Sequence, residues 1–327
     1  MKIAIKDLRS KVLTALSQNG LTEEQNLCIA EQVIWADMSG IKPMGVAKLT
    51  GTEPLQNMKP TGPITIERET KLSQLIDAGG YPAPLICQQA TDVAIRKAEE
   101  HGFAMVGVRN TFSSNLAQAF YVEKIASKDL IGIAMARGPA STAPFESIDP
   151  LFATNPIGFS FPTNGEPLVF DMTTAAMTWS GLILAKANGE TLPPNIAIDP
   201  EGSPTTDPKA AMAGATLPFD GSYKGSGLGL IVETFGGPLV GSLYCDPALD
   251  HEYGSLIMAI DPNLLVDVAD FKSHSSDMIQ KIKSSRKRPG VDEIRLPGER
   301  ARKSRKQAME SGLVEIDDSV AHELGWL

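Results

Sequence analysis

Short apolar runs alternate with longer amphipathic stretches through the middle of the chain, and this alternation limits the fold more than any other feature. The apolar runs lie at 103–108, 130–136, 157–161 and 168–170. Their length and composition predict strands, whereas the spacing at 88–100 and 115–127 predicts helices. Strands and helices that alternate in this way are typical of an α/β domain.

The two ends of the chain have a different pattern. Apolar residues between Ile5 and Leu16 follow the helical period, and Thr22 with Gln25 forms a capping box for a second helix that ends before Gly40. Helical spacing returns past residue 262. We therefore expect a helical domain from 1–70 with 271–327, and an α/β domain over 71–270. Within the latter, 192–221 is rich in Pro, Gly, Asp and Thr, which predicts a long structured loop.

Composition excludes several classes of function. A net charge of −9 argues against nucleic acid as a partner, because that binding requires many positive charges. Three cysteines lie far apart with no CxxC spacing, so we expect neither disulfides nor a metal site, and we expect a reducing, cytoplasmic location. No apolar run approaches eighteen residues, so we expect neither a membrane span nor a signal peptide.

The segment DGSYKGSGLG at 220–229 places Lys224 in a glycine-rich turn at the start of an apolar stretch. Backbone amides at a helix start, together with a lysine, are typical of a site for an anion or a nucleotide. Gly225 follows the lysine, so the hydroxyl of a Walker A motif is missing, and no βαβ unit supports a Rossmann fingerprint. An ordinary tight turn is the alternative.

Five blocks in succession carry a resemblance to a known family. They are ATNPIGFSFPT (153–163), EPLVFDMTTAAMTWSG (166–181), AIDPEGSPTTDPKAAM (197–212), LPFDGSYKGSGLGL (217–230) and IRLPGER (294–300). In order and spacing the chain resembles the malate/L-lactate dehydrogenase family. That family includes sulfolactate, ureidoglycolate and diketogulonate dehydrogenases and the Δ1-piperideine-2-carboxylate reductases.

The resemblance implies a homodimeric oxidoreductase that uses NAD or NADP on a small carboxylate substrate. It also implies a non-Rossmann α/β cofactor domain with a mixed sheet, beside a smaller helical domain built from both chain ends. The family's cofactor-binding segments correspond to Thr154, Asn155, Pro167, Leu168, Val169, Phe170, Asp171, Met172, Thr173, Tyr223, Lys224, Gly298, Glu299 and Arg300. Lys224 and Arg300 suit phosphates, and Glu299 suits ribose hydroxyls.

The chain departs from the family at the motif DxxGxxSHGxxR, in which the histidine is the proposed proton donor and the arginine binds the substrate carboxylate. Met44 occupies the histidine position and Lys48 the arginine position. A second family histidine falls near Ser113, which we assign to the substrate site. A thioether has no proton to give, whereas reduction of a ketone requires one. The chain's four histidines lie elsewhere, at 101, 251, 274 and 322.

Three hypotheses follow from the missing imidazole. The first is a 2-oxo acid reductase or 2-hydroxy acid dehydrogenase in which Lys48, Lys42, Asp171 or a water molecule supplies the proton. The second is a cyclic imine reductase, because a protonated imine already carries the charge that a carbonyl must acquire. The third is a dinucleotide-binding protein without catalytic activity. The choice between NAD and NADP stays open.

Overall fold

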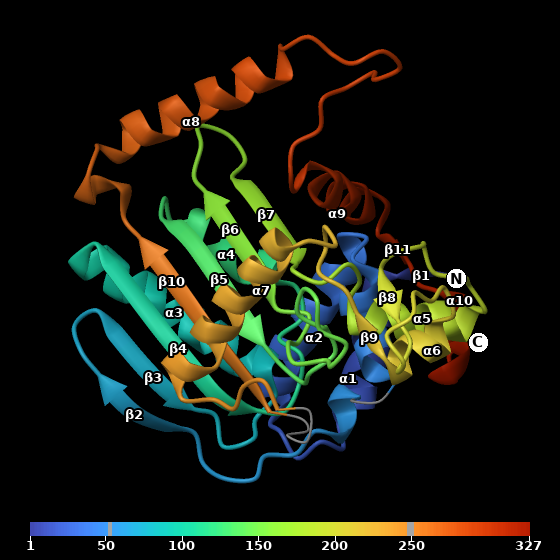
Figure 1. Cartoon of the computed structure of the whole chain (residues 1–327). Helices are drawn as coiled ribbons and strands as arrows, with labels where there is room; N and C mark the ends of the chain where they lie inside the picture. The colour runs from blue at the N-terminus through green and yellow to red at the C-terminus, as the bar shows by residue number, and fades with distance from the viewer. Residues whose placement is uncertain (52–53, 247–251) are drawn as a thin grey trace.

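A mixed sheet of seven strands forms the centre of the molecule (Figure 1). The computed structural model describes residues 1–51, 54–246 and 252–327. The strand order is β2-β3-β4-β10-β5-β6-β7; β3 and β4 are parallel, and the other neighbouring pairs are antiparallel. The strands are β2 (Thr65–Glu69), β3 (Ser73–Asp77), β4 (Phe103–Thr111), β5 (Ile131–Arg137), β6 (Pro156–Phe161), β7 (Leu168–Thr173) and β10 (Tyr253–Ile260).

Helices cover both faces of this sheet (Figure 1). Helices α3 (Ala83–His101) and α4 (Gln118–Ala126) lie on one face, and α7 (Tyr223–Gly236) lies on the other. On the α4 side, a Cβ at Gly132 would lie 3.0 Å from Ile125, so helix and strand pack closely there. On the opposite side Met135 and Ile157 pack against Val232 of α7. These layers confirm the predicted α/β class.

The two ends of the chain meet in a helical region beside the sheet. Its helices are α1 (Ile5–Leu16), α2 (Glu23–Met38), α9 (Glu299–Ser311) and α10 (Asp318–Glu323). Strands β1 (Lys2–Ala4) and β11 (Leu313–Glu315) pair antiparallel and join the ends directly. The predicted capping box of α2 is confirmed, because Thr22 and Gln25 exchange hydrogen bonds of 2.9 and 3.2 Å. The domain boundaries stay a prediction; β2, within the first seventy residues, pairs with β3.

The predicted strands and helices of the middle region are confirmed as β4, β5, β6, β7, α3 and α4. The sequence pattern did not identify β10, which comes more than a hundred residues after its neighbours β4 and β5 and separates them in the sheet. A pattern along the chain gives elements but not their order, since strand pairing depends on contacts that are distant in sequence.

The prediction of one long loop over 192–221 is wrong. This segment contains β8 (Ala197–Ile198), α6 (Pro208–Ala213) and β9 (Ala215–Thr216), and β8 pairs with β9. Helix α6 begins where Asp207 accepts a 3.0 Å hydrogen bond from the Lys209 amide and Pro208 fits the first turn. With α5 (Trp179–Asn188) the segment forms a small core of its own, made of Leu182, Ala185, Leu192, Ala197 and Ala211.

Helix α8 (Val268–Lys283) runs along the edge of the molecule, at the top of Figure 1, and none of its residues is buried. Five short 3₁₀ turns complete the described structure. They are η1 (Lys42–Met44), η2 (Val46–Leu49), η3 (Leu55–Asn57), η4 (Pro238–Val240) and η5 (Pro262–Leu264). The first two carry the residues at the family's histidine and arginine positions.

Candidate active site

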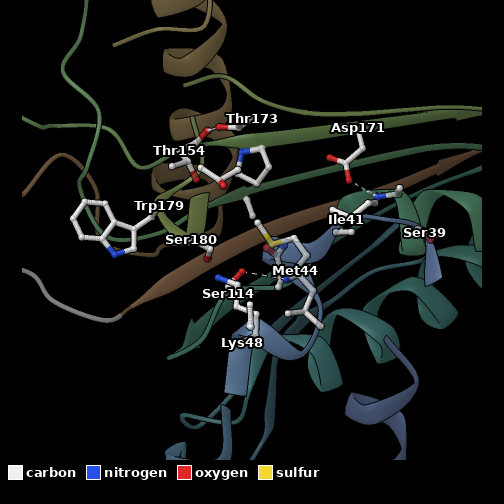
Figure 2. Close-up of a pocket in the computed structure, with 18 of the residues that line it drawn as sticks. Ser39, Ile41, Met44, Lys48, Ser114, Thr154, Asp171, Thr173, Trp179 and Ser180 are labelled. Carbon is white, nitrogen blue, oxygen red and sulfur yellow. Dashed lines mark hydrogen bonds between the residues drawn. The ribbon is translucent and has the colours of Figure 1, made fainter. Parts of the chain in front are cut away.

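A cavity of about 680 Å³ lies between the sheet and the helical region. It is lined by η1 and η2, the loop after β4, the ends of β5 and β7, the start of α5, the start of α9, and α10. Figure 2 shows Met44 in the middle of this group, with Trp179 on one side and Asp171 on the other. The cavity is large enough for a small substrate together with part of a cofactor.

The turns η1 and η2 bring Met44 and Lys48 into the cavity wall. Pro43 fits the first turn of η1, and Gly45 links the two turns. The backbone nitrogen of Lys48 donates a 2.9 Å hydrogen bond to the carbonyl of Gly45. The predicted catalytic residues Met44 and Lys48 therefore lie together, on one short segment of backbone.

Asp171 lies near the end of β7, lines the cavity and faces the start of α4 (Figure 2). Its Oδ2 accepts a 2.9 Å hydrogen bond from the Ala119 amide, and the Gln118 amide also donates to this carboxylate. Burial raises the pKa of Asp171 to about 6, although both amide hydrogen bonds act in the opposite direction. A carboxyl group with this pKa can hold or release a proton near neutral pH.

Ser113, which was predicted at the substrate, lies outside the cavity wall. Its side chain is buried, and its Oγ accepts a 2.9 Å hydrogen bond from the Ala83 amide at the start of α3. The adjacent Ser114 lines the cavity and lies beside Met44 in Figure 2. The two serines are neighbours in the chain, and nothing in the sequence indicates which of them faces the cavity.

The predicted cofactor segment of β7 divides between cavity and surroundings. Val169, Asp171, Met172 and Thr173 line the cavity, as does Thr154 before β6. Pro167, Leu168 and Phe170 do not belong to its lining. The carbonyl of Pro167 instead accepts a 2.7 Å hydrogen bond from Arg302.

Asn155 also lies outside the cavity wall. It is fully buried, with a positive φ of 42°, and its Nδ2 donates to the Gly229 carbonyl at 3.0 Å and to Glu233 at 2.8 Å. Glu233 in turn pairs with Arg137 at 3.4 Å in a buried ion pair. Asn155 thus ties the strand β6 to helix α7, next to the cavity-lining Thr154.

The start of α9 forms another part of the wall. Gly298, at the N-cap position without a side-chain cap, lines the cavity together with Arg300, Ala301 and Arg302. A Cβ at Gly298 would lie 2.7 Å from the Val169 carbonyl, so the helix start packs directly on β7. A helix N-terminus with arginines beside it attracts phosphate groups.

Glu299 is engaged elsewhere. Its carboxylate accepts hydrogen bonds from the Leu296 amide at 3.0 Å and pairs with Lys283 of α8 at 2.6 Å. Burial raises the pKa of Glu299, but the hydrogen bonds from Lys283 and Leu296 outweigh it, and the net pKa is lowered. This side chain connects α8 with α9.

Tyr223 and Lys224 begin α7 and are exposed, and neither belongs to the cavity wall. The free amides expected at this helix start are not available at Lys224 and Gly225. Ser222 Oγ accepts from the Lys224 amide at 3.1 Å, and Asp220 Oδ1 accepts from the Gly225 amide at 3.1 Å. A carboxylate of the chain itself therefore occupies the place of the expected anion.

Some cavity residues were not assigned from the sequence. Trp179 and Ser180 line the cavity; they belong to the family-like block 166–181, but the sequence gave no role for them. On the helical side Arg305 lies 4.5 Å from the ring centre of Trp35 and pairs with Glu123 at 2.5 Å, and all three line the cavity. Trp35 and Glu123 are far in sequence from the family-like blocks, and Arg305 follows the last block, so the sequence gave no indication that they meet.

Other kinds of site find no counterpart in the described parts of the chain. His101, His274 and His322 lie outside the cavity wall, and His251 lies outside the described residues. Within 1–51, 54–246 and 252–327, no group of three or more His, Cys, Asp or Glu side chains is arranged to hold a metal ion. No helix of these ranges is long and apolar enough to cross a bilayer.

Comparison with known proteins gives relatives along almost the whole chain. The malate/(S)-sulfolactate dehydrogenase of Methanothermus fervidus is 31% identical over 335 residues, which cover 99% of this chain and 96% of the relative. The Δ1-pyrroline-2-carboxylate reductase of Ancylobacter novellus is 29% identical over 96% of this chain and 94% of its own length. The relatives thus include both a hydroxy acid dehydrogenase and an imine reductase.

A solved structure has the same fold. The malate dehydrogenase from Entamoeba histolytica superimposes with a TM-score of 0.91 over 99% of this chain and 96% of that chain, at 22% sequence identity. The sequence profile for malate/L-lactate dehydrogenases matches residues 3–325. The chain is therefore a member of the malate/L-lactate dehydrogenase family.

Proposed function

We propose that this protein is an NAD(P)-dependent oxidoreductase that transfers hydride between the nicotinamide and a small 2-oxo or 2-hydroxy carboxylic acid. The observation that carries the proposal is that one cavity joins the Met44–Lys48 segment, the end of β7 and the start of α9. One side of this cavity suits a small carboxylate and the other suits a phosphorylated cofactor. The names of the relatives support the same class of reaction.

The residues around the cavity fit a dinucleotide. The uncapped start of α9, with Arg300 and Arg302, suits the phosphate groups, and the hydroxyl of Thr154, just before β6, offers a hydrogen bond. The hydroxyl of Thr173, at the end of β7, already donates to the Thr154 carbonyl and accepts from the Ala175 amide. When bound, the reduced cofactor supplies a hydride. Lys224 lies outside the cavity, so its contact would be with a part of the cofactor beyond the wall. Both NAD and NADP are consistent with this arrangement.

The chain's own residues supply the charges that the reaction needs. The ammonium of Lys48 attracts the substrate carboxylate as a point charge, without the planar fork of arginine. The carboxyl of Asp171 holds a proton for part of the time near neutral pH, because burial raises its pKa to about 6. We therefore assign carboxylate binding to Lys48 and proton transfer to Asp171.

A specific observation favours a second substrate class, the cyclic imines with an adjacent carboxylate. The side chain at the histidine position is Met44, which lies in the centre of the site and donates no proton (Figure 2). A protonated imine accepts hydride and becomes a neutral amine, so it needs no acid at that position. Several similar proteins carry the name of such a reductase.

The test is oxidation of NADH and NADPH with a panel of substrates. The panel contains pyruvate, oxaloacetate, a branched 2-oxo acid and Δ1-pyrroline- and Δ1-piperideine-2-carboxylate. Turnover of the oxo acids supports the first function, and turnover of the imines alone selects the second. If calorimetry detects cofactor binding but no substrate of the panel is turned over, both proposed reactions are contradicted and the protein is a non-catalytic dinucleotide-binding protein.

We also propose a cytoplasmic homodimer. Helix α8 has no buried residue, and its Met278 and Ile282 are 48% and 40% exposed. Leu265, just before α8, is 92% exposed. An exposed apolar surface of this kind is typical of an interface between subunits. Light scattering after size-exclusion chromatography measures the mass; a monomer of about 35 kDa would contradict the dimer.

A further inference from the structure

The carboxylate of Asp37 packs directly against the backbone that carries Met44 and Lys48. Asp37 lies near the end of α2 and is only 5% exposed. Its Oδ2 accepts a 2.9 Å hydrogen bond from the amide of Val46, the first residue of η2. It does not belong to the cavity wall, so it has no direct access to a substrate.

Gly45 makes this contact possible. A Cβ at position 45 would lie 2.0 Å from Oδ1 and 2.2 Å from Cγ of Asp37, far inside any real contact distance. The φ of Gly45 is −89°, outside the left-handed region, and the close carboxylate leaves no room for a side chain at this position. The backbone of Gly45 also bonds to both turns: its amide donates to the Lys42 carbonyl, and its carbonyl accepts from the Lys48 amide.

We infer that Asp37 is a positioning residue, which fixes the Gly45–Val46 backbone and thereby sets the positions of Met44 and Lys48 in the cavity. The inference rests on the proposed function of the cavity. Met44 directly precedes Gly45, and Lys48 is three residues beyond it. A shift of the backbone at Gly45 therefore moves the substrate side of the site as a unit. The residues of β7 and α9 that face the cofactor belong to other segments.

The first test compares Asp37→Ala with Asp37→Asn. Alanine removes the acceptor for the Val46 amide, and we expect the KM of the best panel substrate to rise at least about 10-fold while the Kd of the cofactor stays unchanged. Asparagine keeps the shape and can still accept from Val46, so it should keep the wild-type KM within about 2-fold. A residue that only stabilised the fold would lower the melting temperature without a selective effect on KM.

The second test is a double-mutant cycle with Gly45→Ala. The added methyl group collides with the Asp37 carboxylate, so the single variant should show the same rise in KM as Asp37→Ala. In the background of Asp37→Ala the collision is absent, so Gly45→Ala should add much less than it does alone. Gly165→Ala is the control, because a Cβ there meets no atom within 4 Å.

Crystal structures of the wild type and of Asp37→Ala separate this inference from the proposed function. Displaced Met44 and Lys48 in the variant support the positioning role even if no panel substrate is turned over. Unmoved side chains, or additive effects of the two substitutions on KM, would overturn it. A wild-type enzyme without turnover would overturn the proposed function alone.

Discussion

The carboxylate of Asp171 and the backbone nitrogen of Ala119 are 2.9 Å apart, so a side chain at the end of β7 accepts a hydrogen bond from the first turn of α4. The same carboxylate lines the cavity. The helix start stabilises the charged form, while burial favours the neutral form. Asp171 is therefore held in one place and is able to exchange a proton.

Asp171→Asn should lower kcat by about 100-fold or more, because an amide cannot transfer the proton that we assign to this carboxyl. Asparagine can still accept from the Ala119 amide, so the fold and the cofactor Kd should change little. Steady-state kinetics and calorimetry on one preparation check both statements. A variant with wild-type kcat would leave Asp171 as a helix cap only.

Met44→His should raise kcat/KM for a 2-oxo acid at least about 10-fold, since it restores a proton donor at the centre of the site. The pH profile of the variant should acquire a group with a pKa of about 6.5. Met44→Leu is the control, because it keeps an apolar side chain of similar size. Equal rates for the histidine and leucine variants would show that no proton is delivered from position 44.

Arg300 and Lys224 are both predicted to bind the cofactor, but only Arg300 lines the cavity. We expect Arg300→Ala to raise the cofactor Kd by about 10-fold, or ~1.4 kcal/mol, and Lys224→Ala to have a smaller effect. Lys303→Ala serves as the control, because Lys303 is exposed and lies on the same helix as Arg300. Calorimetry with NADH and NADPH measures all three. A larger rise in Kd for Lys224→Ala than for Arg300→Ala would indicate that the cofactor binds at the start of α7 and not at α9.

The stability of the protein should fall as pH rises from about 4 to about 8. Burial raises the pKa of Asp37 to about 8; the nearby Asp317 adds to this, while the Val46 amide and Lys42 oppose it. An unfolded aspartate has a pKa of about 3.9, so between these values the unfolded chain releases a proton that the folded chain keeps. The free energy of unfolding should decline by on the order of 1 kcal/mol per pH unit in that window.

Asp37→Asn removes this titration and tests the assignment. Between pH 6 and 8.5 the melting temperature of the wild type should fall more than that of the variant. Asp171, whose pKa is about 6, is present in both proteins, so its titration cancels and the difference belongs to Asp37. If the melting temperatures of the two proteins change equally with pH across this interval, a pKa of about 8 for Asp37 is contradicted.

The sequence by itself determined the family, the α/β class and most of the elements. The capping box at Thr22 and Gln25 and the apolar runs of β4 to β7 are local patterns, which depend on residues close together in the chain. The successive sequence blocks likewise identified the family along nearly the whole length. Met44 in place of histidine was also visible from the sequence, since a motif shows a substitution without any structure.

The tertiary structure decided which side chains meet. Ser114 rather than Ser113 faces the cavity, Asp220 occupies the helix start beside Lys224, and Trp179 joins the wall. Asp37 against Gly45 is a contact that no periodicity encodes, because it depends on the path of the turn between them. Burial, pKa shifts and neighbours across the sheet arise from packing of segments that are distant in sequence, and local patterns contain no record of that packing.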